Sequence, residues 1–130
     1  MRIKIITPAE IKVDAPARWV RADAPDGSFA LLPRHIDFVT RLVPGLITFE
    51  RTDGAIRYAG SGAATLVKRG PDVMISAHDV VLGDTPDEVQ QQLARALRTI
   101  DEIERQERAL LARLEADMIR RFQDLERQTG

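Results

Sequence analysis

The stretch GDTPDEV, from Gly83 to Val89, divides this sequence into two parts with different folding signals. All seven prolines lie at or before Pro86, and so does every glycine except the terminal Gly130. Because proline and glycine favour turns and interrupt helices, their loss after this stretch predicts a change of structure there. We therefore predict two domains, residues 1–85 and residues 86–130, and expect the first to fold without the second.

The part before this stretch predicts an all-β sandwich. Short segments rich in β-branched residues alternate with turn signals, and Ile11–Val13 and Arg18–Arg21 are expected as separate strands. The clearest hairpin joins Ile47–Arg51 to Ala55–Ala59, because Asp53-Gly54 between them tolerates the positive φ of a tight turn. Many short strands without intervening helices are typical of a sandwich or barrel.

The part after this stretch predicts helix. Thr85 or Asp84 can cap its start, and Pro86 suits a first helical turn. Apolar residues then recur at steps of three and four, as expected for one face of an α-helix. The recurring positions are Val89, Leu93, Ala96, Ile100, Ile103, Leu110, Leu114, Met118, Phe122 and Leu125.

The apolar spacing is interrupted once, at Glu107. Residues 104–108 are therefore either the middle of one long helix or the bend between two. We expect a bend near Ile103–Glu107 with two antiparallel helices, because a straight helix would leave its apolar face exposed. The expected fold class is α+β, with a sandwich of about ten short strands followed by a helical hairpin or a long helix.

Composition excludes several classes of function. The chain has 130 residues, is 44% hydrophobic and carries a net charge of −1, so it lacks the basic surplus typical of nucleic-acid binding. It has no cysteine, which rules out disulfides and thiolate chemistry. No apolar run approaches the roughly 20 residues of a membrane span, and the N-terminus has no signal-peptide core. We expect a cytoplasmic protein without direct membrane insertion.

Residues that could support catalysis are sparse. The segments His35-Ile36-Asp37 and His78-Asp79 offer two histidines with no third partner at metal-ligand spacing. Gly60-Ser61-Gly62 lacks the lysine and helix of a phosphate loop. The serines have no general base at a recognisable spacing. The sequence therefore predicts no catalytic residue, no metal and no cofactor.

Charged residues crowd the predicted helix, which contains eight arginines, ten acids and no lysine. One interpretation is a solvated face with i,i+4 ion pairs such as Glu104–Arg108. The other is a partner-binding surface, because arginine can grip carboxylates with two parallel hydrogen bonds. The candidate contacts are Arg105, Arg108, Arg113, Arg120 and Arg121.

The segment Gly27–His35 resembles Gly-x-x-Gly-Ile-x-Pro-Gly-His, a segment of the epsilon subunit of F-type ATP synthases. Leu42–Gly45 is similar to that family's Leu-x-Pro-Gly, and the likeness continues in Tyr58, Ser61-Gly62 and Val73–Ala77. The sequence departs from the family pattern where Ala30 and Arg34 replace glycines and where Asp37 stands at a common proline position. These features look like the divergent branch of a second type of F-ATPase operon, which often serves sodium-pumping enzymes.

The resemblance implies a non-catalytic subunit of the rotor's central stalk, at the cytoplasmic face of the bacterial membrane. It implies contacts with the gamma subunit and the membrane c ring, and coupling of proton or sodium flow to ATP synthesis or hydrolysis. The implied contact candidates are Ser28, Leu32, Pro33, Arg34 and His35. The resemblance also implies two C-terminal helices that can reach the catalytic alpha/beta hexamer and inhibit ATP hydrolysis.

Some members of that family bind ATP through Ile/Leu-Asp-x-x-Arg-Ala in the first helix. Here Ile100-Asp101 is followed by an arginine one position late, at Arg105. One residue turns a helix by about 100°, so we expect no ATP site. Two alternatives remain open. One is a β-sandwich ligand-binding module with a dimerising helical tail, and the other is a metalloenzyme using His35 and His78.

Overall fold

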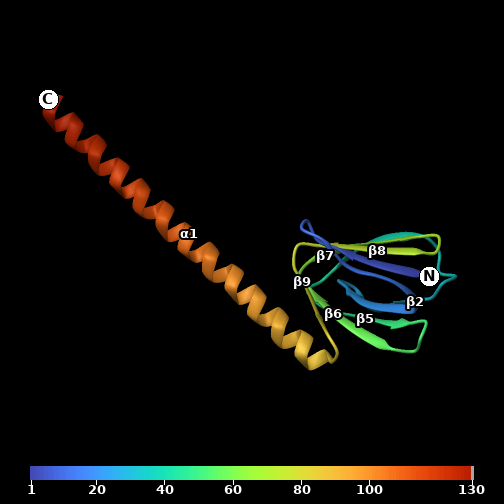
Figure 1. Cartoon of the computed structure of the whole chain (residues 1–130). Coiled ribbons are helices and arrows are strands. Elements are labelled where there is room, and N and C mark those ends of the chain that lie inside the picture. The colour runs from blue at the N-terminus through green and yellow to red at the C-terminus, as the bar shows by residue number, and fades with distance from the viewer. Residues whose placement is uncertain (130) are drawn as a thin grey trace. The chain divides into compact units, whose positions relative to one another are not determined.

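The computed structural model describes residues 1–129 and confirms the α+β class, with nine strands and one helix in this range (Figure 1). The elements, in chain order, are β1 (Arg2–Ile6), β2 (Ile11–Ala24), β3 (Gly27–Leu31), β4 (Phe38–Leu42), β5 (Gly45–Arg51), β6 (Ile56–Ser61), β7 (Ala64–Arg69), β8 (Asp72–Ala77), β9 (Val80–Gly83) and α1 (Pro86–Thr129). The chain divides into two compact units. The first is Met1–Ala96, and the second begins at Leu97.

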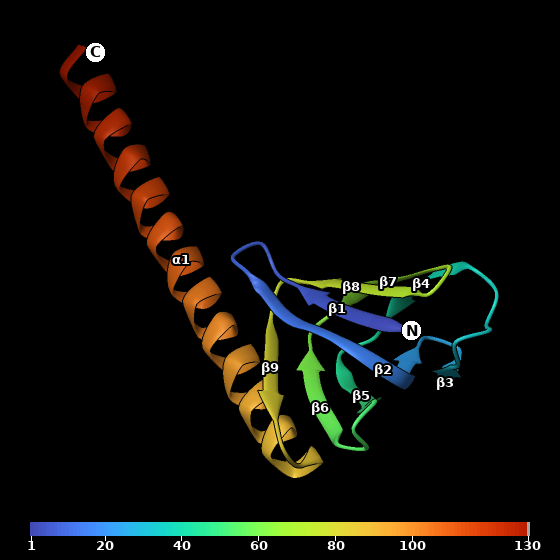
Figure 2. The same cartoon turned by 45° about the vertical axis from the view of Figure 1, so that its right-hand side comes forward.

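The nine strands form two layers. One layer contains β4, β7, β8, β1 and the first half of β2, and the other contains β3, the second half of β2, β5, β6 and β9. Figure 2 shows β1, β8, β7 and β4 in one layer and β5, β6 and β9 in the other. Alternating side chains from both layers fill the core between them, including Ile3, Val20, Ile47, Leu66 and Ile75. Such a close-packed interior makes the sandwich a stiff body.

The strand β2 belongs to both layers. It runs without interruption through residues 11–24, so the prediction of two separate strands here was wrong. Pro16 lies where β2 leaves β1 for its pairing with β5, and a register shift follows between Ala17 and Trp19. Proline has no N–H to donate, but at this change of partners the strand can continue without that bond.

The predicted hairpin at Asp53-Gly54 is confirmed. The strands β5 and β6 pair antiparallel on either side of it, and Gly54 has a φ of +89°. The Asp53 carboxylate accepts a hydrogen bond from the Ala55 N–H at 3.0 Å. Glycine adopts this backbone conformation without steric cost, which explains the turn sequence.

The helix α1 begins as the sequence predicts. The Glu88 N–H donates to the Thr85 hydroxyl at 3.2 Å, so Thr85 is the residue that caps the helix. The first turns pack on β6 and β9, where Val89 and Leu93 are buried. A Cβ atom built at Gly60 would lie 2.7 Å from Val89, and one built at Gly83 would lie equally close. These two glycines therefore provide the space that the first turns of α1 need.

The predicted bend near Ile103–Glu107 is wrong, because α1 is one continuous helix through Thr129. Residues 104–108 are all good helix formers, and a polar residue on the apolar face does not break backbone hydrogen bonds. The predicted hairpin would need a turn, and the segment offers neither glycine nor proline to make one. Within residues 1–129, no helix is long and apolar enough to cross a membrane.

Candidate functional site

The predicted contact residues lie mainly in the loop between β3 and β4, residues 32–37, which we call the corner. The His35 N–H donates to the Leu32 carbonyl at 3.0 Å, which closes a four-residue turn. Pro33 occupies the second position of this turn, where its fixed φ is favoured. The turn therefore presents Pro33 and Arg34, both exposed, at its tip.

The corner exposes apolar side chains beside its charge. Leu32 is 59% exposed and Ile36 is 77% exposed, while Val39 at the start of β4 is 67% exposed. Large apolar groups grouped in this way commonly mark an interaction site. The sequence prediction included Leu32 but missed Ile36 and Val39. Val39 could have been found, because it shares a strand face with the exposed, charged Arg41.

Two aromatic contacts hold the base of the corner. The His35 ring packs against Phe38 with centroids 5.0 Å apart, and Phe38 meets Phe29 edge to face at 5.7 Å. The Nδ1 atom of His35 also lies 2.8 Å from the Ile36 carbonyl oxygen. These contacts fix the His35 ring, so this residue stabilises the corner although it is exposed.

Ser28 lies on β3 rather than in the corner. Its hydroxyl donates to the Asp23 carboxylate on the paired strand β2. Ser28 and His35 line one surface hollow of about 320 Å³, together with Phe29 and Phe38. The structure thus brings Ser28 and His35 to the same place, whereas Leu32, Pro33 and Arg34 are not part of that hollow.

Two hydrogen bonds tie the corner to the turn between β7 and β8. The Lys68 Nζ atom donates to the His35 carbonyl at 3.1 Å and also to the Gly70 carbonyl. The Gly70 N–H donates to the Asp37 carboxylate at 2.7 Å. The corner is consequently fastened at two positions, His35 and Asp37, to a turn more than 30 residues later in the chain.

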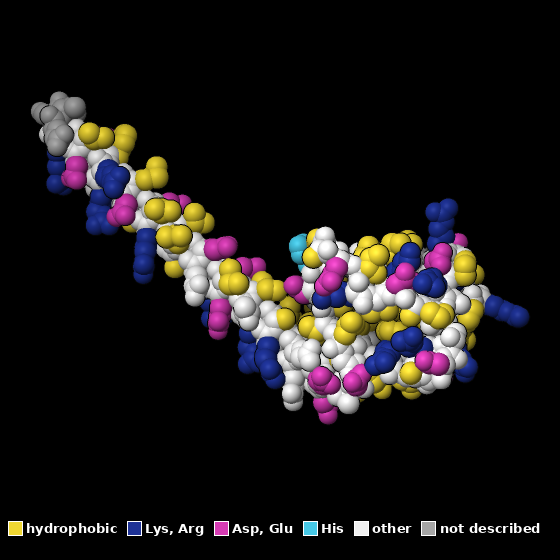
Figure 3. Space-filling model, in the orientation of Figure 1, with side chains coloured by type: hydrophobic (Ala, Val, Ile, Leu, Met, Phe, Trp, Pro, Cys, Tyr) yellow, Lys and Arg dark blue, Asp and Glu magenta, His cyan; other side chains and the backbone are white. Residues whose placement is uncertain are grey.

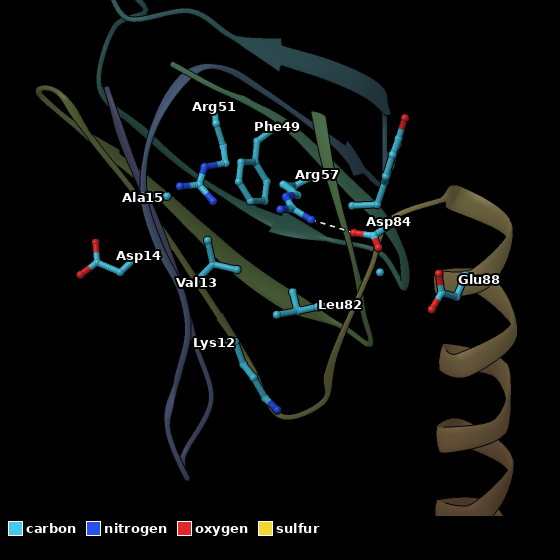
Figure 4. Close-up of a pocket in the computed structure, with 12 residues that line it drawn as sticks. Lys12, Val13, Asp14, Ala15, Phe49, Arg51, Arg57, Leu82, Asp84 and Glu88 are labelled. Atoms are coloured by element: carbon cyan, nitrogen blue, oxygen red, sulfur yellow. Dashed lines mark hydrogen bonds and ion pairs between the residues drawn. The ribbon is translucent and has the colours of Figure 1, made fainter. Parts of the chain in front are cut away.

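A larger cleft of about 460 Å³ opens at the edge of the sandwich (Figure 4). Its apolar floor includes Val13, Phe49 and Leu82, and charged groups stand on its rim. Several of these charges are already paired. Arg57 contacts Asp84 at 2.7 Å, as the dashed line in Figure 4 shows, and Lys12 contacts Glu10 at 2.8 Å. The Arg57–Asp84 pair links β6 to the segment that enters α1, and because both side chains are largely exposed it adds little stability.

Asp14 on the same rim is held by Arg2, with 2.6 Å between Nε and the carboxylate. This hydrogen bond, with the positive charges of Arg2 and Lys4, lowers the pKa of the Asp14 carboxyl below its ordinary value. The side chain is exposed, so the effect on stability is small. In the described part of the chain, no group of three or more His, Cys, Asp or Glu residues could hold a metal ion.

The candidate arginines of the tail all lie exposed on α1. At about 100° per residue, Arg105, Arg113 and Arg120 fall on the side opposite the apolar residues. Arg108 falls on the flank between the two sides, and Arg121 falls on the apolar side. Figure 3 shows this division, with hydrophobic side chains gathered along one side of the helix and Lys or Arg along the other.

Two of these arginines have local contacts. Arg120 pairs with Asp117 at 2.7 Å, and Arg108 donates to the backbone carbonyl of Glu104 at 3.4 Å. The apolar side of the same region is exposed too, including Leu110, Leu114, Met118 and Phe122. The helix beyond Leu97 therefore offers two distinct faces, one apolar and one basic.

Comparison with known proteins identifies relatives over nearly the whole chain. Residues 1–83 match the family described as ATP synthase, Delta/Epsilon chain, beta-sandwich domain. ATP synthase epsilon chain 2 of Paraburkholderia xenovorans is 34% identical over 125 residues, covering 94% of this chain and 89% of the relative. A protein with the same name from Cereibacter sphaeroides is 26% identical over 122 residues, which cover 92% of this chain and 84% of the relative.

Solved structures show the same fold at low sequence identity. A chain of the mitochondrial ATP synthase of Euglena gracilis matches with a TM-score of 0.61 and 19% identity, over 75% of this chain and 61% of that one. A chain from the central stalk and c ring of the Tetrahymena thermophila enzyme matches with a TM-score of 0.54 and 13% identity. It covers 62% of this chain and 65% of that one, so both structural matches span less than two thirds of the solved chains.

Proposed function

We propose a function from the premise that this chain belongs to the epsilon-chain family of F-type ATP synthases, as its sandwich and its relatives show. It is a non-catalytic subunit of the rotor, peripheral to the membrane, and two of its relatives bear the name epsilon chain 2. Its contacts are the part that we propose. The chain joins the gamma subunit and the c ring, and so couples ion flow to ATP synthesis or hydrolysis at the cytoplasmic face of the bacterial membrane.

The corner is the proposed contact with the c ring. The observation that supports this proposal is an exposed apolar and basic loop held by hydrogen bonds on a rigid sandwich. Torque passes only through parts that do not deform, and a loop tied at His35 and Asp37 meets that need. Leu32, Pro33, Arg34 and Ile36 supply the exposed contact atoms, and His35 and Ser28 shape the hollow beside them.

The test replaces Arg34 and His35 together by glutamate. Both side chains are exposed, so the variant should still fold: Arg34→Glu should cost about 0.5 kcal/mol or less, and His35→Glu should cost more because it also removes the ring contact with Phe38. We expect weaker capture of the c ring by the variant. A matched control carries Arg21→Glu and His78→Glu, which make the same charge change at exposed positions outside the corner. Normal capture by the corner variant would remove the corner from the interface.

The tail is the second proposed contact surface, in a two-part organisation of residues 1–85 for docking and residues 86–130 for regulation. The observation behind it is the exposed apolar face of α1 beyond Leu97, which is larger than a single scattered side chain. The catalytic alpha/beta hexamer and the gamma subunit are the proposed occupants of this face. Around the rest of the helix and at the edge of this face, Arg105, Arg108, Arg113, Arg120 and Arg121 would bind carboxylates of the same partners, and the bound tail would slow ATP hydrolysis.

A further inference from the structure

Lys68 is a charged residue in the interior of the sandwich. Its side chain is only 2% exposed, and it lies on β7 at the position where the alternation of the strand points inward, after Ala64 and Leu66. Lysine is almost never fully buried unless its amino group has partners, because removing the charge from water is costly. The contacts of its Nζ atom should therefore explain its place in the fold.

The Lys68 Nζ atom donates to two backbone carbonyl oxygens, both in loops. One is His35 O, at 3.1 Å, and the other is Gly70 O. A lysine amino group has three donors and no acceptor, so one side chain can satisfy two carbonyls at once. Lys68 thereby joins the corner to the β7–β8 turn. The backbone pairing of β4 with β7 starts only at Phe38, opposite Lys68, so it does not include the corner residues 32–37.

A second bond runs beside the first. The Asp37 carboxylate accepts the Gly70 N–H at 2.7 Å, and Gly70 has a φ of +55°, in the region that favours glycine. The two hydrogen bonds hold the corner at His35 and at Asp37, which are two residues apart. A loop held at two points has fewer orientations than a loop held at one, so its exposed side chains are already arranged before a partner arrives.

We propose that Lys68 is a positioning residue for partner docking. By holding the His35 carbonyl, it fixes the direction in which Leu32, Arg34 and Ile36 face the partner. Fixing a loop before binding raises affinity, because less conformational entropy is lost when the complex forms. This inference rests on the proposed docking of the corner on the c ring. In it, the buried Lys68 supports that contact through the corner and does not touch the partner.

The main variant is Lys68→Met, which keeps a long unbranched side chain and removes the donors. We expect its affinity for the c ring to fall roughly tenfold, because binding must then order the loop that the hydrogen bond held in the free protein. Amide hydrogen exchange should accelerate in residues 32–38 and stay unchanged in the β5–β6 hairpin. Lys4→Met controls for the loss of one lysine charge, because Lys4 is a half-buried residue of β1 that lies opposite Asp14 and Met74, and it should leave both measurements unchanged.

Chemical rescue separates the amino group from simple packing. The chain has no cysteine, so Lys68→Cys can be alkylated at one site with bromoethylamine in denaturant and then refolded. The product restores an amino group at nearly the length of lysine. We expect unmodified Lys68→Cys to bind weakly and the aminoethylated protein to recover wild-type affinity. Weak binding by both forms would overturn the role of the amino group.

Asp37→Ala gives an independent test at an exposed position, where misfolding is not a concern. It removes the second bond, so it should also speed exchange in residues 32–38 and weaken capture of the c ring. Normal binding by Lys68→Met or Asp37→Ala, while the Arg34→Glu/His35→Glu variant binds weakly, would overturn the positioning role and leave the corner in place. Normal binding by all three would overturn the docking proposal itself.

Discussion

The first turns of α1 and the rest of that helix have the same apolar spacing but opposite environments. Val89 is fully buried against Gly60 and Gly83, whereas Met118 is 71% exposed. The difference comes from the surface that each part meets, since two glycines provide space for the first turns. An amphipathic pattern therefore predicts that a helix has an apolar face, and it does not identify what that face contacts.

The largest expected effect comes from removing the buried turns. Fragment 1–96 keeps Val89 and Leu93, and fragment 1–85 loses both. Burying one such side chain contributes about 1.5–3 kcal/mol, so fragment 1–85 should be less stable by roughly 3–6 kcal/mol. Urea denaturation of both fragments measures the difference, and we expect each to fold as a sandwich. Equal midpoints would mean that the first turns of α1 do not stabilise it.

A smaller effect is expected from shortening one buried side chain. Leu93→Ala should cost about 2–4 kcal/mol, because it removes core contacts and leaves a cavity. The matched substitution Leu114→Ala, at an exposed position of the same helix, should change the free energy of unfolding by less than about 0.5 kcal/mol. Thermal unfolding of the two variants provides the comparison. Similar losses would contradict the assignment of buried and exposed segments.

The glycine contact sharpens the same comparison. Gly60→Ala adds a Cβ atom 2.7 Å from Val89, and overpacking of this kind costs about 1–3 kcal/mol. Combining it with Val89→Ala should cost less than the sum of the two changes, because the smaller side chain makes room. A double-mutant cycle measured by denaturant unfolding checks this. Additive costs would show that the two residues do not share the space.

The smallest expected effect concerns Asp14 and pH. Arg2 lowers the pKa of this carboxyl in the folded chain, so its ion pair adds stability above the ordinary carboxyl pKa. That contribution disappears as the pH falls through the lowered pKa. The difference in melting temperature between the wild type and Asp14→Asn should be small at neutral pH and shrink in acid. A difference that grew toward acid would contradict the assigned sign.

Local signals in the sequence predicted much of the fold. The Asp53-Gly54 turn and the Thr85 cap depend on neighbouring residues, and both are confirmed. The strands predicted at Ile11–Val13 and Arg18–Arg21 are one strand, because β2 continues through Pro16 at the point where it changes partners. The predicted bend near Glu107 was also wrong. The exposed face suggested a partner within the chain, while the backbone itself had no cause to turn.

The candidate site was less predictable than the fold. The corner could be found as a segment of the sequence. The hydrogen bond from Lys68 to His35 that holds it could not, because these residues are 33 positions apart and lysine is usually exposed. Ile36 and Val39 were missed because apolar residues in a sequence predict burial by default. The alternation of β4 turns Val39 outward beside Arg41, whereas Ile36 lies in the loop before that strand, where no alternation predicts its exposure.

We propose above that α1 beyond Ala96 binds partners and slows ATP hydrolysis. The most direct measurement is steady-state hydrolysis by the reconstituted complex, with either the full chain or fragment 1–96, at the same ATP and salt concentrations. Fragment 1–96 keeps the buried turns, so a change in rate reports the loss of the exposed helix alone. We predict faster hydrolysis with the fragment and retained coupling to ion flow. Equal rates in the two complexes would contradict the inhibitory role.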